Sequence, residues 1–470
     1  MSWTHGNRGL HDRLERAGTV RTIAFAAVTS FTVYFCMYGF RKPLAVATYA
    51  GHDFAGTGVQ LKTALVLSQL VGYVASKYIG IKFCSQLKRE QLFVATVALI
   101  GLAELSLLGF ALLPTDWKVV AIFFNGLPLG MVWGLAMRYL EGRRATELLV
   151  ATLSCSYIFA TGVVKDAGKW LLQTWEIDPF WMPFWVGLIF LPPLVISAWL
   201  LDALPRPDEK DRIERSERTA MTAGDQWTFL AHFSIGLILL SFIYVMLTAF
   251  RDFRDNYAIE ILKELNLAEV PGIFTQIEVV SAIVITVTLG GLSLFRHNRH
   301  ALVATFGIMI CGTLLIGTST MLWHARVING LSWMILVGLG AYLAYVPYTV
   351  LFDRIFAATR ATGTSVFAIY LIDSLGYTGS FGVQLYKDLW KGDISRLVFF
   401  SGFALTLSVV GLVSLLFSGW YFIREERLAR LRLQREADAS LGVDFADDAS
   451  LADDVIAING LGNHSPADTT

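Results

Sequence analysis

Long apolar runs alternate with short polar segments along most of the chain. Twelve runs are long enough for a helix to cross a bilayer, which takes about 20 residues. They cover residues 22–50, 61–81, 91–113, 119–140, 146–173, 180–201, 228–252, 272–295, 301–323, 328–352, 362–386 and 395–423. Backbone groups cannot stay unpaired in lipid, and the alternating pattern of a membrane barrel is absent, so each run is predicted as a helix. The sequence therefore predicts an all-α polytopic membrane protein with twelve transmembrane helices.

The composition narrows the class of protein further. Apolar residues make up 55% of the 470 residues and charged residues 16%, against about 25% charged residues in a typical soluble domain. Lys plus Arg and Asp plus Glu number 38 each, so there is no basic excess for nucleic-acid binding. The four cysteines are widely spaced, and the sequence contains no metal-binding or catalytic motif. We therefore expect no metal, no cofactor and no enzymatic activity.

One polar stretch, residues 202–226, divides the runs six and six. It predicts an N-terminal six-helix bundle over residues 1–201, a central loop over 202–226 and a C-terminal six-helix bundle over 227–423. The remaining tail, 424–470, starts with a possible basic helix. From Ala437 onward the tail contains seven Asp and no Lys or Arg, which is typical of a largely disordered, solvated segment.

Basic residues are distributed unevenly between the two sides of the predicted bundle. The segments on the side of the chain termini contain 24 Lys and Arg, whereas the alternate connections contain seven. Positively charged loops stay in the cytoplasm during insertion. Both termini and the central loop are therefore expected to be cytoplasmic, in an integral protein of a bacterial inner membrane.

Two short matches indicate an internal repeat. The segments Tyr34–Arg41 and Tyr244–Arg251 share Tyr, Phe and Arg at the same spacing, 210 residues apart. The segments Asn125–Leu127 and Asn329–Leu331 both read Asn-Gly-Leu, 204 residues apart. The similar offsets predict two pseudo-symmetric bundles, a plan in which transporters bind substrate between the halves near mid-membrane.

Arginines at equivalent positions of the repeat predict an anion site. A charged side chain inside a span costs several kcal/mol and needs a reason. Arg41 and Arg251 would repel each other across a cavity unless an anion lay between them, and a guanidinium matches phosphate or carboxylate with two hydrogen bonds. Two alternatives stay open: Arg41 could reach the outer interface, and Arg251 could pair with Asp255. Arg254, on the same helix face as Arg251, is a further candidate.

Other polar residues within the runs are candidates for the same cavity. Lys77 is either a second cation near the site or a partner for Asp373 or Glu278. Candidate substrate contacts also include the tyrosines Tyr34, Tyr38, Tyr244, Tyr345 and Tyr370, although tyrosine stripes often only satisfy hydrogen bonds between helices. Asp373, Glu278 and Asp166 are candidates for proton coupling; Asp166 is equally consistent with neutralised packing beside Lys165.

The arrangement resembles the major facilitator superfamily: six plus six helices, cytoplasmic ends and a long central loop. The segment Tyr34–Lys42 is similar to the first-helix signature of its organophosphate:phosphate antiporters. Ser76-Lys77-Tyr78 is similar to a Ser-Lys-Phe in the second helix of that branch, and Asn125-Gly126 to its glycine-rich fourth helix. The resemblance implies that Arg41 and Arg251 hold a phosphate and that Lys77 matches the helix-2 lysine of the branch.

The sequence also departs from that branch. The Asp-Arg that normally follows helix 2 in the superfamily is replaced by Ser85–Arg89, which reads SQLKR. Acids beside the arginines of the seventh helix, in Phe250–Asp255, could cancel their charge. The segments Gly39–Pro43 and Tyr139–Arg144 look more like an uncharacterised bacterial branch of the superfamily.

These patterns predict a secondary active transporter of a small anionic solute, an organic phosphate or a similar anion. It would work by rocker-switch alternating access, through exchange or proton coupling. Two alternatives remain: a transporter-like membrane sensor of an anionic ligand, and a carrier of the superfamily with a non-phosphate substrate. The solute and the lipid bilayer are the expected partners, with no nucleic acid, and the protein is expected to be a monomer.

Overall fold

The computed structural model describes residues 8–57, 59–140, 143, 146–206, 223–293, 295, 297–359 and 365–440. Twelve long helical segments occur in these residues, one for each predicted run. They are α2 (Thr19–Met37), α3 (Leu61–Gln86), α4 (Leu92–Leu112), α5 (Thr115–Leu140), α6 (Thr146–Thr174), α7 (Met182–Asp202), α10 (Ser234–Asn256), α12 (Ile273–Ser293), α13 (Asn298–His324), α14 (Gly330–Tyr345) with α15 (Tyr348–Thr359), α16 (Ser365–Trp390) and α17 (Arg396–Ser440). Shorter helices lie between or before them: α1 (Arg8–Arg16), α9 (Ala223–His232), α11 (Ala258–Glu264) and the 3-10 turns η2 (Tyr38–Phe40), η3 (Pro43–Ala45) and η4 (Arg89–Gln91).

The lengths and compositions of these helices fit a membrane protein. Within the described residues, nine of the helical segments are long and apolar enough to cross a bilayer. The other three, α3, α6 and α16, have 26, 29 and 26 residues. These three carry Lys77, Lys165 and Asp373, charges that the sequence placed inside spans. The prediction of an all-α polytopic membrane protein is therefore confirmed, and a long helical segment lies at each of the twelve predicted runs.

Two predicted helices are interrupted, each next to a proline. The first apolar run was expected to be helical over residues 22–50, but α2 ends at Met37 and continues as the turns η2 and η3, with Pro43 opening η3. The tenth run divides at Pro347, between α14 and α15. Proline removes a backbone donor and clashes with the preceding turn. The break after Met37 brings the backbone at Arg41 out of the α-helix.

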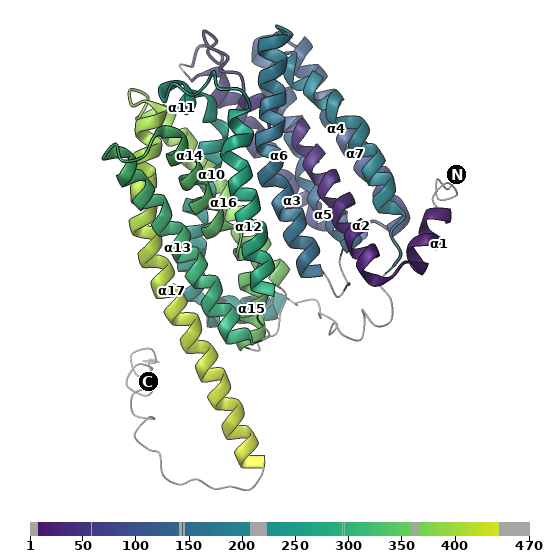
Figure 1. The fold of residues 1–470 in the computed structure, drawn as a ribbon, viewed down its shortest axis with the longest axis vertical. Coiled ribbons are helices and arrows are strands. Elements are labelled where there is room, and N and C mark those ends of the chain that lie inside the picture. Colours follow the sequence, from purple (N-terminus) through teal and green to yellow (C-terminus); the bar gives the residue numbers. More distant parts are fainter. Residues whose placement is uncertain are drawn as a thin grey trace, which may run out of the picture.

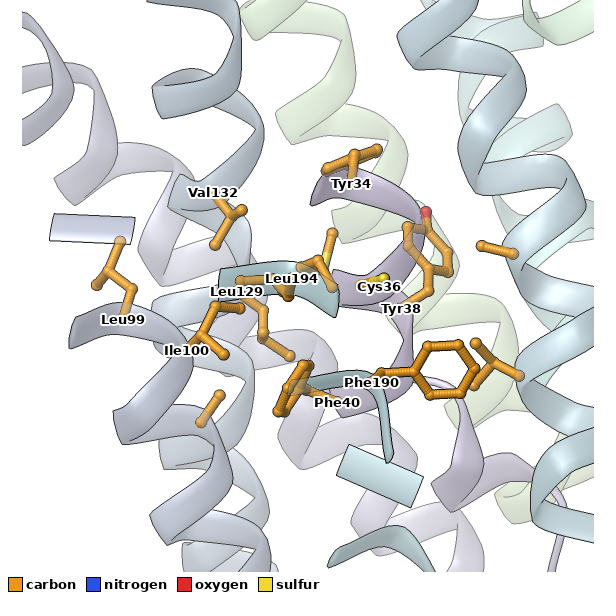
Figure 2. Packing of buried hydrophobic residues seen from close by; sticks show 14 of the residues in the cluster. Tyr34, Cys36, Tyr38, Phe40, Leu99, Ile100, Leu129, Val132, Phe190 and Leu194 are labelled. Carbon is orange, nitrogen blue, oxygen red and sulfur yellow. The ribbon is translucent and has the colours of Figure 1, made fainter. Parts of the chain in front are cut away.

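Buried apolar side chains form two large clusters. One cluster takes its residues from Ala26 to Leu204, with Tyr377 added from the second half; the other runs from Phe229 to Phe422. Figure 2 shows part of the first cluster, where Phe40 and Phe190 lie near Leu129 and Leu194. A third, smaller cluster lies between α6 and α12. Each half thus packs around its own core, and the halves meet where α6 contacts α12 and α3 contacts α16.

The chain ends define two faces of the molecule. In Figure 1, α1 and the C-terminal end of α17 lie at the lower end, which we call the terminal face. The opposite end, with α11 and the turns after α2, we call the distal face. The helix α17 continues past the other helices at the terminal face and ends at Ser440. The predicted central loop falls between α7 and α9, where residues 207–222 lie outside the described residues.

Glycines let α3 and α5 approach each other closely. A Cβ atom added at Gly126 would lie 2.2 Å from the carbonyl oxygen of Gln69, and one added at Gly72 would lie 2.2 Å from the carbonyl oxygen of Phe123. These contacts involve backbone atoms, which cannot rotate away. Small residues at such contacts are the main way in which membrane helices gain packing energy.

We expect Gly126→Ala to destabilise the protein by about 1–3 kcal/mol, the usual cost of overpacking a core. Gly101→Ala is the matched control, since a Cβ atom at Gly101 meets nothing within 4 Å and alanine favours helix by about 1 kcal/mol over glycine. Thermal unfolding of the purified protein in detergent measures both. Equal unfolding temperatures for the two variants would contradict the close α3–α5 packing.

Candidate functional site

Arg41 follows the turn η2 and lies inside the molecule. Arg41 is only 7% exposed. Its guanidinium carbon lies 3.9 Å from the centroid of the Tyr73 ring on α3. Among the described residues no acidic side chain forms an ion pair with Arg41, and its Nε is buried without a hydrogen-bond acceptor. A buried guanidinium that lacks an anionic partner is costly. Arg41 is therefore the strongest candidate for contact with a bound anion.

The backbone at Arg41 is held by two amide side chains that were not among the candidate site residues. Asn125 on α5 is fully buried and donates hydrogen bonds of 3.1 Å to the carbonyl oxygens of Phe40 and Ala103. Gln69 on α3 donates to the Arg41 carbonyl at 3.3 Å and to the Asn125 side chain at 2.8 Å. These bonds satisfy carbonyl groups that the end of α2 leaves free, and they fix the position of Arg41.

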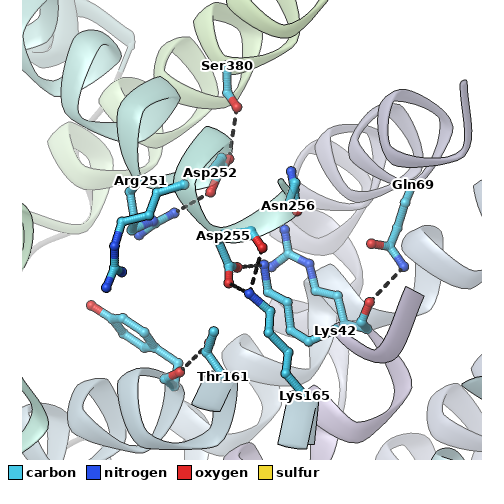
Figure 3. Close-up of polar contacts among 12 residues, drawn as sticks. Lys42, Gln69, Thr161, Lys165, Arg251, Asp252, Asp255, Asn256 and Ser380 are labelled. Carbon is cyan, nitrogen blue, oxygen red and sulfur yellow. Dashed lines mark hydrogen bonds and ion pairs between the residues drawn. The ribbon is translucent and has the colours of Figure 1, made fainter. Parts of the chain in front are cut away.

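Arg251 lies on α10, opposite the first half. Its guanidinium carbon is 4.1 Å from the centroid of the Tyr345 ring, and it donates to Asp252 at 3.1 Å. Asp252 also accepts a hydrogen bond of 3.0 Å from Ser380, and Figure 3 shows this acid beside Arg251. Arg251 does not pair with Asp255 in the structure, because Asp255 binds lysines of the other half.

A chain of polar contacts connects the two arginines across the halves. On the N-terminal side, Lys77 lies 5.2 Å from the centroid of the Tyr73 ring, the same ring that the Arg41 guanidinium contacts. The Lys77 ammonium is 3.1 Å from the carboxylate of Asp373 on α16. Tyr244 lies 2.9 Å from that carboxylate and 2.8 Å from the hydroxyl of Tyr345, the ring under Arg251. Arg41, Lys77, Asp373 and Arg251 thus belong to one continuous network.

Further tyrosines surround this network. Tyr34 and Tyr38 are buried on the N-terminal half, with ring centroids 5.6 Å apart. Tyr38 stacks on Tyr157 of α6 at 6.4 Å, and Tyr377 lies 5.1 Å from Tyr73. Tyr157 had no signal in the sequence, whereas Tyr73 and Tyr377 each stand four residues from a charged residue of the network, one helical turn away. The side chain of the remaining candidate, Tyr370, lies outside the described residues.

Arg254 and Glu278 are paired with each other within the C-terminal half. Their side chains are 2.8 Å apart, and Arg254 also donates to the carbonyl of Met334 at 3.2 Å. A Cβ atom at Gly338 would lie 2.3 Å from the Arg254 guanidinium, so this glycine makes room for the arginine. Among the described residues, Arg254 is therefore bound by Glu278 and Met334 and shares no hydrogen bond with the arginine network.

Asp166 caps a helix of the other half. Its carboxylate accepts hydrogen bonds from the backbone N–H of Phe274 at 3.2 Å and of Thr275 at 2.7 Å, at the start of α12. These N–H groups have no partner within their own helix. Of the three coupling candidates, only Asp373 lies in the network, while Asp166 and Glu278 lie in separate polar contacts.

Ion pairs close the distal side between the halves. Asp255 on α10 accepts hydrogen bonds from the ammonium groups of both Lys42 and Lys165, and Figure 3 shows both lysines converging on it. Lys62 pairs with Glu260 on α11 at 2.6 Å. The role of Lys165 was open from the sequence alone, and Lys42 was not expected to be the partner of an acid. The structure is therefore closed at the distal face by contacts of the N-terminal half with α10 and α11.

Basic side chains outnumber acidic ones around the interface. Counting the ion-paired and buried groups near α10, there are six basic and four acidic side chains: Arg41, Lys42, Lys77, Lys165, Arg251 and Arg254 against Asp252, Asp255, Glu278 and Asp373. The difference is two positive charges. In the part of the chain that the structure describes, no group of three or more His, Cys, Asp or Glu is placed to hold a metal.

The fold is similar to those of solved transporters. The crystal structure of a D-xylose–proton symporter has a TM-score of 0.57 and 17% sequence identity, with 86% of this chain and 98% of that chain covered. The crystal structure of the peptide transporter POT, in a mutant form bound to alafosfalin, has a TM-score of 0.56 and 13% identity, with 87% and 97% covered. At such low identity the likeness shows the fold alone, which this chain shares with these two transporters.

Sequence comparison assigns the family. A search of curated proteins gives no match, and neither structural neighbour belongs by its name to the organophosphate:phosphate antiporters. A family model described as a family of unknown function, DUF5690, matches residues 43–425. These residues include ten complete long helices and most of the polar network. The chain therefore belongs to the DUF5690 family.

Proposed function

We propose that this protein is a secondary active transporter of a small anionic solute, an organic phosphate or a similar anion. The observation that carries the proposal is the buried guanidinium of Arg41, which has no acidic partner among the described residues and stacks on Tyr73. A planar guanidinium binds a phosphate or carboxylate with two parallel hydrogen bonds. A bound anion would supply the negative counter-charge that Arg41 lacks.

The surroundings of Arg41 also favour an anion over a neutral solute. The excess of two positive charges near the interface attracts negative charge, and the burial of these groups strengthens the attraction by lowering the local dielectric constant. Tyrosine hydroxyls around the network can donate hydrogen bonds to oxygen atoms of a solute. A sugar or another neutral solute would leave Arg41 without its counter-charge.

Transport would proceed by alternating access around the contact between the halves. The lysine pairs of Asp255 and the pair Lys62–Glu260 close the distal side. Breaking them would let the two halves rotate apart at that face, as in other transporters built from repeats. From the count of basic residues we propose that the terminal face is cytoplasmic and the distal face is outside.

A thermal-shift screen of the purified protein tests the proposal. A ligand that binds only the folded state raises its stability by about 2.7 kcal/mol at 100 times its Kd. We expect phosphorylated metabolites or carboxylates to raise the unfolding temperature and neutral sugars to leave it unchanged. Stabilisation by neutral sugars alone would contradict the anion proposal and would favour a carrier with a non-phosphate substrate.

A membrane sensor is the second candidate function, favoured by the long helix α17. This helix continues past the predicted end of its span at residue 423 to Ser440 and projects beyond the bundle at the terminal face (Figure 1). It carries five arginines after residue 423, which could contact a signalling partner.

Deletion of residues 437–470 separates the two functions. For a transporter we expect flux in proteoliposomes within about twofold of the full chain, since the deletion leaves every residue of the network around Arg41 in place. The folded state of the shortened chain is checked by its unfolding temperature. Loss of flux with an unchanged unfolding temperature would favour the sensor, because the deleted tail would then control the state of the bundle.

A further inference from the structure

Asp373 occupies the centre of the network and faces charged or titratable groups from several helices. Lys77 of α3 lies 3.1 Å away, and Tyr244 of α10 lies 2.9 Å away. Tyr73 of α3, Tyr345 of α14 and Tyr377 of its own helix are within electrostatic range. The helix α15 also packs on α16, and its Arg354 donates a hydrogen bond to the Asn298 side chain of α13 at 3.2 Å.

The hydroxyl neighbours of Asp373 suit both of its protonation states. A tyrosine hydroxyl has one proton to donate and lone pairs to accept with. When Asp373 is ionised, Tyr244 donates to it and accepts from Tyr345. When Asp373 is protonated, it donates to Tyr244, which then donates to Tyr345 at 2.8 Å. The hydrogen bond between Asp373 and Tyr244 therefore survives protonation with its direction reversed, because a hydroxyl can both donate and accept.

The other acids near the interface are held mainly by lysine, arginine or backbone donors. Asp255 accepts from two lysines and Glu278 from Arg254. Asp252 accepts from Arg251 and Ser380. Asp166 accepts from two backbone N–H groups of α12.

The cation that pairs with Asp373 lies against the same tyrosine ring as Arg41. Lys77 and Arg41 lie against the same ring, that of Tyr73, at 5.2 and 3.9 Å from its centroid. An anion bound by Arg41 therefore lies within reach of the Lys77 ammonium, which sits on a flexible four-carbon stem. A bound anion would compete with Asp373 for this ammonium.

From this arrangement we infer that Asp373 takes up one proton when an anion binds and draws Lys77 away. A buried carboxylate that loses its cation is strongly disfavoured, and a proton from water removes its charge while Tyr244 keeps the hydrogen bond. Lys77 stays protonated and pairs with the anion. The inference rests on the proposed anion transport, and it makes Asp373 the residue that couples the anion to a proton.

The test measures proton uptake on binding of methyl phosphate, the simplest phosphate monoester. At about pH 8 a phosphate monoester is almost fully dianionic, because its second pKa is near 6, so the free ligand brings almost no proton with it and the variants show which group takes one up. The full-length protein in detergent is titrated calorimetrically in two buffers of different ionisation enthalpy, which gives the number of protons bound per ligand. Asp373→Asn is compared with Glu278→Gln, an acid of the same half that lies outside the network. Each variant is first checked by its unfolding temperature.

We expect the wild-type protein and Glu278→Gln to take up about one proton per methyl phosphate, and Asp373→Asn to bind it without proton uptake. Because a proton is taken up on binding, the affinity for methyl phosphate should also rise as pH falls, by up to about tenfold per pH unit. Asp373→Asn should remove this pH dependence. Wild-type binding without proton uptake, or undiminished uptake by Asp373→Asn, would overturn the role of Asp373 while leaving anion binding intact. Absence of binding by wild type, at concentrations that would saturate a millimolar site, would instead overturn the phosphate proposal and the inference with it.

If Asp373→Asn does not fold, Tyr244→Phe replaces it. This substitution removes the acceptor of the protonated acid, so proton uptake should fall below half a proton per methyl phosphate. Unchanged uptake would overturn the inference.

Discussion

Arg41→Lys should lower the rate of anion uptake by roughly 100-fold at low substrate concentration. Lysine keeps the charge but offers a point ammonium in place of the planar fork, so it cannot form two parallel bonds with an oxyanion. A hydrogen bond to a charged group is worth about 1.5–3 kcal/mol, and each 1.4 kcal/mol corresponds to a tenfold change in affinity. Uptake into proteoliposomes of the anion that gives the largest thermal shift measures the effect.

Arg396→Lys is the matched control for this experiment. The guanidinium of Arg396 also lies over a tyrosine ring, 4.0 Å from the centroid of Tyr257, but it pairs with Asp388 at 2.5 Å. Its replacement by lysine keeps that ion pair, so we expect uptake within about threefold of wild type. Equal uptake by Arg41→Lys and wild type would remove Arg41 from the site, and the anion proposal would lose its main support.

The twelve helices were predictable because the bilayer sets their length. Each apolar run had to supply about 20 residues of helix, and the ends of most helices fall within a few residues of the predicted ends. The early end of α2 was not predicted, because it combines the effect of Pro43 within the run with a contact outside the run. A Cβ atom at Gly39 would lie 2.7 Å from the side chain of Phe190 on α7, so this turn is shaped by its neighbour in space.

The repeat was visible in the sequence, but only one of its two matches joins residues of similar structural role. Arg41 and Arg251 both stack on a tyrosine near the interface of the halves. Asn125 is buried in the middle of α5, where it donates to two carbonyl groups. Asn329 instead caps the start of α14, accepting from the backbone N–H of Ser332 at 2.8 Å. A three-residue match does not determine depth in the bundle, so the second match was misleading.

The choice of ion-pair partners depends on packing between the halves and could not be predicted from the sequence. Spacing along α10 favoured Asp255 for Arg251, since residues four apart are neighbours on a helix. The structure gives Asp255 two lysines from the other half, Lys42 and Lys165, and leaves Asp252 for Arg251. Residues 213 and 90 positions away in the chain thus supply the partners of Asp255. The types of residue at the site could be predicted, but the pairs that close the distal face could not.

Asp255→Asn should open the distal side of the protein. Asparagine carries no charge, so Lys42 and Lys165 would remain buried without a counter-charge in the closed form. Removing one partner of a buried ion pair costs about 3–5 kcal/mol. In an open form both lysines reach water, so the cost falls on the closed form, and the equilibrium shifts toward the open form by more than about 100-fold.

A reporter cysteine measures this opening. Thr63 is fully buried at the distal interface, with its hydroxyl 3.0 Å from that of Tyr257 in the other half. The native Cys311 is exposed and is replaced by serine, while the other three cysteines are buried. With Thr63→Cys in this background, a membrane-impermeant thiol reagent should react slowly with the otherwise wild-type chain. It should react at least tenfold faster after Asp255→Asn.

A charge-matched variant separates lost charge balance from general damage. Combining Asp255→Asn with Lys42→Gln and Lys165→Gln removes the two unpaired charges along with the acid, so the closed form no longer carries their cost. We expect the labelling of Thr63→Cys to slow again, toward the wild-type rate. Fast labelling in the combined variant would mean that altered packing around the substituted side chain, and not charge, opens the distal side. Slow labelling in Asp255→Asn itself would mean that Lys62–Glu260 and the Asp166 cap of α12 suffice for closure, because they would then outweigh two buried charges.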